Sequence, residues 1–99
     1  MKTTRKIEKI LKEHKKDIKK KYEVKKIGIF GSYIRGEEKR RSELDILVEF
    51  EKNAKIDLLG FINLGNYLSN LLGRRVDLVE KKCLKPYIGR RILQEVVYV

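Results

Sequence analysis

Acidic side chains occupy three positions from which they could handle a metal ion and a phosphate together. Glu43 and Asp45 are separated by one residue at the start of an apolar, strand-like run, and Asp77 lies in the middle of a second such run. Side chains at positions i and i+2 of a strand point to the same face. Neighbouring carboxylates repel one another, and Mg²⁺ relieves that repulsion because it shares carboxylate oxygens with phosphates. If the two strands are neighbours, the three acids form one cluster around two metal ions, an arrangement suited to phosphoryl transfer.

A glycine-serine pair, Gly31-Ser32, ends the apolar run Val24–Phe30, and ten residues separate it from the acid pair. Glycine lets the backbone approach a ligand closely, and serine adds a hydroxyl and an N–H to the turn. Such groups can cradle phosphates. Arg35 follows within the same connection as the residue best placed to bind or brace, and three further cations are Lys39, Arg40 and Arg41.

Each feature has a simpler structural explanation when it is taken alone. Two acids at i and i+2 are typical of a solvated edge strand, a glycine-serine pair is typical of a turn, and a single aspartate can be a surface residue. The joint arrangement of strand, turn, spacer, acid pair and third acid favours a site. With His14 as the only histidine and Cys83 as the only cysteine, the composition argues against catalytic triads, zinc centres and an intramolecular disulfide.

Length and charge limit the possible classes of protein. Ninety-nine residues predict one domain spanning residues 1–99, with 41% apolar residues for a core and a formal net charge of +11. Twelve of the 25 basic residues lie within residues 1–26, a Lys-rich segment interpreted chiefly as a solvated or partner-facing surface. No apolar run approaches the length of a membrane span and residues 1–26 do not resemble a secretory signal, so a cytoplasmic protein is expected.

Hydrophobic periodicity predicts the elements that must position the site. A helix is expected after a cap at Thr3 or Thr4, with His14 on its flank, and a C-terminal run at Val96–Val99 is expected either to dock on the core or to face a partner. The order of elements predicts an α/β (α+β) fold with a small mixed β-sheet flanked by helices. Between the first helix and the C-terminal run we expect strands at Val24–Phe30, Leu44–Phe50 and Arg75–Val79. We also expect two helices, one at 58–72, which is capped by Asp57 and stopped by Gly73, and one from Pro86 to about Gln94.

Nearly the whole chain resembles the minimal nucleotidyltransferases of the polymerase-beta-type superfamily. The resemblance is carried by Gly31–Gly36 and Ser42–Phe50, and Arg75–Val79 with Lys85–Val99 matches the usual ending of the family. It implies the nucleotidyltransferase fold, an NTP with Mg²⁺ and nucleotidyl transfer. Members of the family often pair as antitoxins with HEPN-type ribonuclease toxins, and some transfer AMP from ATP to a toxin tyrosine.

The resemblance also assigns roles to individual residues. Gly31 and Ser32 match the nucleotide-binding turn, and Arg35 matches an arginine with a structural or phosphate-binding role. Asp45 matches a metal-binding acid. Asp77 matches the third acid, which helps to activate the attacking hydroxyl and completes the metal site.

Glu43 departs from the family pattern, because the first metal-binding acid is normally aspartate. The extra methylene changes the reach of the carboxylate, and octahedral Mg²⁺ is strict about geometry. The first hypothesis is therefore a Mg²⁺-dependent transferase of AMP from ATP to a hydroxyl of a HEPN-type toxin, with which it forms a hetero-oligomer. One alternative is a weak or inactive member that neutralises the toxin by binding alone. The other is nucleotidyl transfer to RNA, or RNA binding, for which aromatic stacking residues are few.

Overall fold

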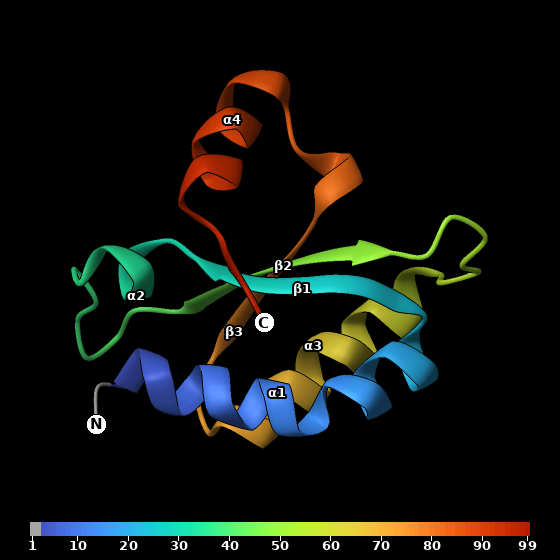
Figure 1. The fold of residues 1–99 in the computed structure, drawn as a ribbon, viewed down its shortest axis with the longest axis horizontal. Coiled ribbons are helices and arrows are strands. Elements are labelled where there is room, and N and C mark those ends of the chain that lie inside the picture. Colours follow the sequence, from blue (N-terminus) through green and yellow to red (C-terminus); the bar gives the residue numbers. More distant parts are fainter. Residues whose placement is uncertain (1–2) are drawn as a thin grey trace.

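The computed structural model describes residues 3–99, which form a four-stranded mixed sheet with helices on both faces (Figure 1). The strand order is β3-β2-β1-β4. Strand β1 is antiparallel to β2 and β4, whereas β2 is parallel to β3. This arrangement confirms the predicted fold class. The elements are α1 (Thr3–Tyr22), β1 (Val24–Phe30), α2 (Ser32–Arg35), β2 (Leu44–Phe50), α3 (Leu58–Leu72), β3 (Val76–Glu80), the 3₁₀ helix η1 (Lys81–Cys83), α4 (Pro86–Glu95) and β4 (Val97–Tyr98).

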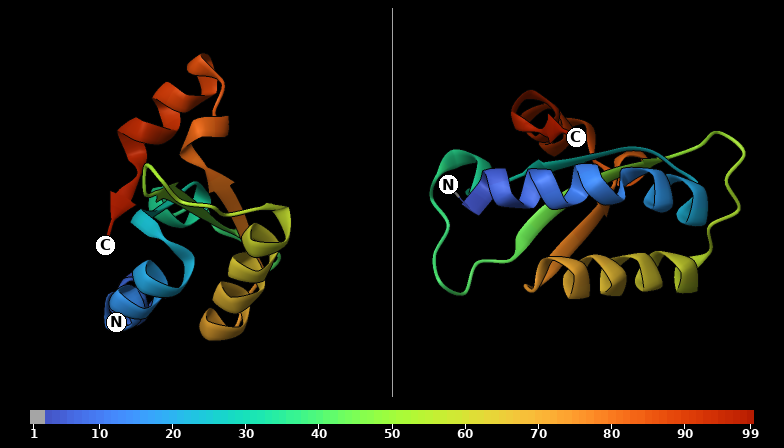
Figure 2. Two further views of the ribbon diagram at one scale, coloured as in Figure 1. Left: turned by 90° about the vertical axis from the view of Figure 1, so that its right-hand side faces the viewer. Right: turned by 60° about the horizontal axis from the view of Figure 1, so that its bottom comes forward.

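The two faces of the sheet have different roles. Helices α1 and α3 lie side by side against one face, and α4 stands on the other (Figures 1 and 2). Because strand side chains alternate, Ile46 and Val48 of β2 enter the core beneath α1 and α3. Asp45 emerges on the face below α4. The alternation therefore separates a dry core from a face that is available for chemistry.

Helix α3 begins and ends as its sequence predicts. The carboxylate of Asp57 accepts a hydrogen bond from the Gly60 N–H at 2.8 Å, and Gly73 takes the left-handed conformation after the last turn. Leu64 and Leu68 of this helix are fully enclosed and Leu72 is buried, whereas Leu58, Leu59 and Ile62 are exposed.

The expected threonine cap of α1 is wrong. Thr3 and Thr4 both lie inside the helix, and the Thr4 hydroxyl donates a 3.1 Å hydrogen bond to the Tyr33 carbonyl. That bond ties the start of α1 to α2. His14 lies on the flank of α1, where its Nδ1 is 2.9 Å from the Ile10 carbonyl oxygen.

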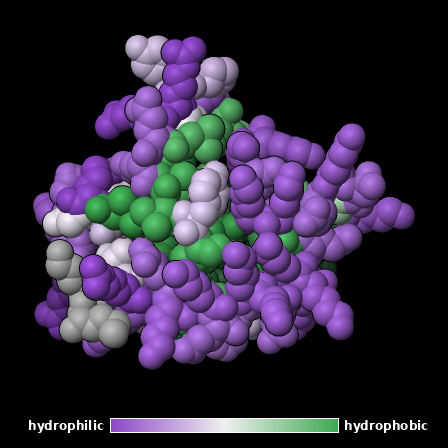
Figure 3. Space-filling view, in the orientation of Figure 1, coloured by the Kyte–Doolittle hydropathy of each residue, from purple (hydrophilic) through white to green (hydrophobic). Residues whose placement is uncertain are grey.

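The C-terminal residues dock on the domain as strand β4. The Val99 N–H donates to the Ile27 carbonyl at 3.0 Å, and Val97 pairs with Ile29 on β1. Gly28 makes this approach possible, since a Cβ there would lie 2.7 Å from a methyl carbon of Val96. Figure 3 shows an apolar area between α4 and the C-terminal end, surrounded by hydrophilic side chains. Within residues 3–99, no helix combines the length and apolar character that a membrane crossing requires.

Candidate active site

A cleft of about 290 Å³ lies between the sheet and α4, where the two predicted parts of the site meet. Gly31 and Arg35 reach it from the turn after β1, and Asp45 reaches it from β2. The remaining lining comes from Phe30 and from the α4 residues Tyr87, Ile88, Arg91, Ile92 and Glu95. The α4 residues were not foreseen as part of the site, because α4 enters it only through the tertiary fold.

Asp45 and Asp77 face one another across two parallel strands. They are register partners in the β2–β3 pairing, which confirms that the third strand neighbours the second. Burial is the largest cause that raises the pKa of Asp45, followed by the charge of Asp77, a hydrogen bond with Asp77 and the charge of Glu43, and together they bring this pKa to about 6. A carboxyl group held this way gives up its proton reluctantly unless a cation approaches.

Glu43 lies at the edge of this arrangement. It is exposed and comes just before β2, although its negative charge is near enough to raise the pKa of Asp45. Among residues 3–99, no three His, Cys, Asp or Glu side chains are gathered closely enough to form a ready-made metal cluster. The donor chemistry nevertheless fits Mg²⁺, because Asp45 and Asp77 are paired oxygen donors whose mutual repulsion a divalent cation would relieve. They are the two residues that would hold the ion, and Glu43 would have to turn toward them to join.

The glycine of the turn is required by its neighbour. Gly31 has φ +80°, and a Cβ at this position would overlap the Asp45 carboxylate. The Gly31 carbonyl accepts hydrogen bonds from the N–H groups of Ile34 and Arg35 at 3.0 and 3.1 Å, so the turn continues directly into α2 at Ser32. The predicted turn and the predicted acid are thus packed against each other.

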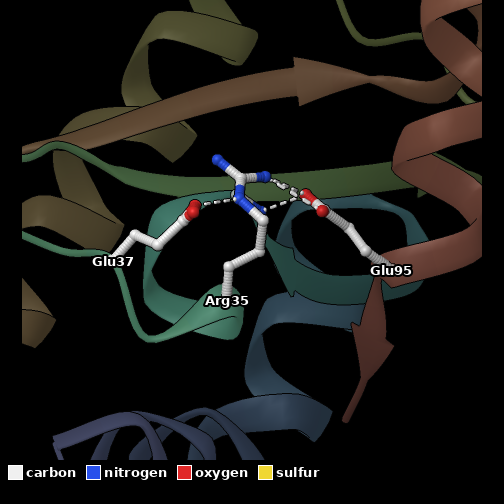
Figure 4. Close-up of polar contacts among 4 residues, drawn as sticks. Arg35, Glu37 and Glu95 are labelled. Atoms are coloured by element: carbon white, nitrogen blue, oxygen red, sulfur yellow. Dashed lines mark hydrogen bonds and ion pairs between the residues drawn. The ribbon is translucent and has the colours of Figure 1, made fainter.

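Arg35 is held by two carboxylates, neither of which was predicted to belong to the site. Its Nε donates to Glu37 at 2.8 Å, and its Nη1 donates to both oxygens of Glu95 at 2.9 and 3.0 Å (Figure 4). Hydrogen bonds to Glu37 and then to Glu95 raise the pKa of Arg35, which therefore stays a cation. Glu95 Oε2 also accepts a 2.6 Å hydrogen bond from the Gly31 N–H. No local pattern pointed to Glu95, because it lies 64 residues from Gly31.

A second pocket, of about 550 Å³, gathers four arginines beside the same strand ends. Arg40 and Arg41 reach it from the loop before β2, and Arg74 and Arg75 reach it from the loop before β3. Within the described part of the chain, none of the four forms an ion pair with a carboxylate. The sequence predicted Arg40 and Arg41 as available cations, but only the fold shows that Arg74 and Arg75 lie beside them.

The fold is that of a nucleotidyltransferase. The nucleotidyltransferase domain family matches residues 11–99, and the chain belongs to that family. Its sequence is 52% identical over 99 residues to a protein adenylyltransferase, MntA, of Thermococcus cleftensis, a match that covers all of this chain and 98% of that protein. It is 51% identical over 100 residues to a candidate protein adenylyltransferase of Methanocaldococcus jannaschii, with both chains fully covered.

Solved structures show the same likeness. A candidate minimal nucleotidyltransferase superposes with a TM-score of 0.74 at 31% sequence identity. The superposition covers 98% of this chain and 95% of that chain. A chain of a toxin–antitoxin crystal structure with AMP-PNP superposes with a TM-score of 0.71 at 25% sequence identity. The superposition covers 93% of this chain and 70% of that chain. The chain is therefore a transferase of the nucleotidyltransferase family.

Proposed function

We propose that this protein transfers AMP from ATP to a tyrosine hydroxyl of a HEPN-type toxin and acts as the antitoxin of that pair. The observation that carries the proposal is the placement of Asp45 and Asp77, in register on adjoining strands, beside the glycine turn at Gly31. Relatives and structural neighbours named as protein adenylyltransferases and as toxin–antitoxin complexes support the same reaction.

In the proposed reaction, the acceptor oxygen forms a bond to the α-phosphorus of ATP. The bond from that phosphorus to the bridging oxygen of the β-phosphate breaks, and pyrophosphate leaves. Asp77 takes the proton of the attacking hydroxyl, while Gly31, Ser32 and Arg35 hold the phosphates. Mg²⁺ bound by Asp45 and Asp77, with Glu43 completing the set, would supply charge stabilisation for the phosphates.

Helix α4 is the surface that we assign to the toxin. Tyr87 and Ile88 are 86% and 56% exposed, and both line the cleft. Leu93 adds a further exposed apolar side chain on the same helix. An acceptor docked here would meet the acids without a second domain of this chain, and the pair would form a hetero-oligomer.

Radiolabelling tests the proposal. The protein is incubated with a HEPN-type toxin protein, Mg²⁺ and ATP labelled at either the α- or the γ-phosphate. We expect label in the partner from α-labelled ATP alone, abolished by chelator and by Asp45→Asn or Asp77→Asn. Label from γ-labelled ATP would indicate phosphorylation and would contradict AMP transfer. Glu43→Asp should be faster than the natural protein if the longer side chain holds metal poorly.

The same variants test the alternative in which the antitoxin acts by binding alone. Under our proposal, Asp45→Asn fails to protect cells that express the toxin. Full protection by this variant, with no label in the partner from the natural protein, would favour neutralisation by binding.

The four-arginine pocket favours RNA as a second candidate ligand. Guanidinium groups bind phosphates bidentately, and Arg40, Arg41, Arg74 and Arg75 are free of carboxylate ion pairs within residues 3–99. This candidate predicts affinity for an RNA oligonucleotide that falls steeply between 50 and 200 mM salt, and that weakens in Arg74→Gln. The measurement is fluorescence anisotropy, and a signal that does not change with added RNA at 50 mM salt would exclude RNA as a ligand.

A further inference from the structure

Glu95 occupies the position in the turn that the proposed function gives to phosphate. Its Oε2 accepts the Gly31 N–H at 2.6 Å, and both of its oxygens accept from Arg35 Nη1. These two donors are the ones expected to bind the nucleotide. A carboxylate and a phosphate offer similar anionic oxygens to such donors, so the two compete for the same place.

We propose that Glu95 is an internal substitute for a nucleotide phosphate, and that ATP must displace it from Gly31 and Arg35 before it can bind productively. This inference rests on the proposed function, because it concerns the phosphates of the same nucleotide. It makes Glu95 a residue that sets nucleotide affinity, and not a catalytic residue.

The position of Glu95 suits an exchange of this kind. It is the last residue of α4, and 23% of its side chain is exposed, so its carboxylate has solvent into which it can turn. Arg35 is 44% exposed, and Figure 4 shows its second terminal nitrogen directed away from both carboxylates. The guanidinium can therefore begin to contact an incoming phosphate while Glu95 still holds its other side.

Glu37 provides a matched control for charge alone. It is also paired with Arg35, through Nε at 2.8 Å, and it is 58% exposed, but it makes no hydrogen bond to Gly31. Removing either carboxylate lowers the negative charge beside Arg35 by one unit. Only the change at Glu95 also replaces the charged acceptor of the Gly31 N–H by a neutral amide, which holds this backbone donor more weakly.

The test measures binding of AMP-PNP with Mg²⁺ by calorimetry to the natural protein, Glu95→Gln and Glu37→Gln. We expect Glu95→Gln to bind at least about tenfold more tightly, since the three charge-assisted hydrogen bonds of the Glu95 carboxylate to Gly31 and Arg35 no longer have to be broken. Glu37→Gln should change affinity less than about threefold. Pyrophosphate, a second probe that lacks base and sugar, should show the same order.

The outcomes separate this inference from the proposed function. If the natural protein binds AMP-PNP and Glu95→Gln binds equally or more weakly, Glu95 positions Arg35 for the nucleotide and the inference is overturned while the function stands. If no form of the protein binds nucleotide, both fail.

A structure of the natural protein with AMP-PNP needs no variant and so remains decisive if Glu95→Gln folds poorly. We expect a phosphate oxygen, in place of Glu95 Oε2, within hydrogen-bond distance of the Gly31 nitrogen. A Glu95 carboxylate still bound to Gly31 beside the nucleotide would overturn the inference.

Discussion

Asp45 should destabilise the metal-free protein at neutral pH, and Asp45→Asn should therefore make it more stable. Its pKa is about 6 in the folded chain, against an ordinary aspartate value of 3.8. A difference of roughly two pKa units corresponds to about 3 kcal/mol, and partial exposure of the side chain lowers the expected gain to about 2 kcal/mol. The cause is burial of a carboxylate near Asp77 and Glu43.

The sign of the pH dependence follows from the raised pKa. The folded state holds the Asp45 proton more tightly than the unfolded chain does, so the stabilising contribution is complete below pH 3.8. It is lost as pH rises through about 6. The advantage of Asp45→Asn should therefore be small near pH 3.5 and reach its full size by about pH 7.5, because the amide does not titrate.

Urea unfolding with a chelator present, repeated across this pH range, measures the effect without the screening that guanidinium salt would add. Glu38→Gln, an acid-to-amide change at an exposed loop position, is the control and should stay within about 0.5 kcal/mol of the natural protein. An Asp45→Asn protein that is no more stable at pH 7.5, or whose advantage is the same at pH 3.5, would refute the reasoning. Added Mg²⁺ should stabilise the natural protein and leave Asp45→Asn unchanged.

Three further predictions concern the turn, the cap and the core. Gly31→Ala should abolish AMP transfer and lower the free energy of unfolding by about 2 kcal/mol or more, because the new Cβ overlaps Asp45. The control is Gly36→Ala, since Gly36 shares the positive φ but has open space around it. This variant should lower the free energy of unfolding by about 1 kcal/mol and keep the transfer activity. Asp57→Ala should lower the free energy of unfolding by about 1 kcal/mol in urea titrations, because the α3 cap is lost. Asp57→Asn should keep most of this stability. Equal losses in both variants would show that the cap hydrogen bond is not the cause. Ile46→Ala should cost about 2–5 kcal/mol, because this fully buried side chain lies beneath both α1 and α3, and a loss below 1 kcal/mol would mean that the core closes over the cavity.

The helices and strands were largely predictable, because the signals that set them are local. Strands β1 and β2 and helix α3 have their expected bounds, and β3 lies one residue later than expected. The cap at Asp57 and the stop at Gly73 act through neighbours three to five residues away. The error at Thr4 has the opposite cause, since its hydroxyl bonds to Tyr33, which is 29 residues distant.

The chemistry of the candidate site was predictable in part. Spacing within β2 determined that Asp45 would leave the core face, and the family pattern selected Asp77 as its partner. No spacing rule determined that Glu43 would remain exposed at the strand edge. Its position depends on the loop that precedes β2, where strand alternation no longer applies.

The sequence by itself determined which residues could handle phosphate and metal, because residue type and strand alternation are properties of short segments. Only the tertiary structure decided which groups surround them. Closing the chain brings Glu95 of α4 onto Gly31 and Arg35, and it brings two pairs of arginines to one pocket. Contacts between residues 60 or more positions apart leave no local pattern, because they arise from packing α4 against the completed sheet.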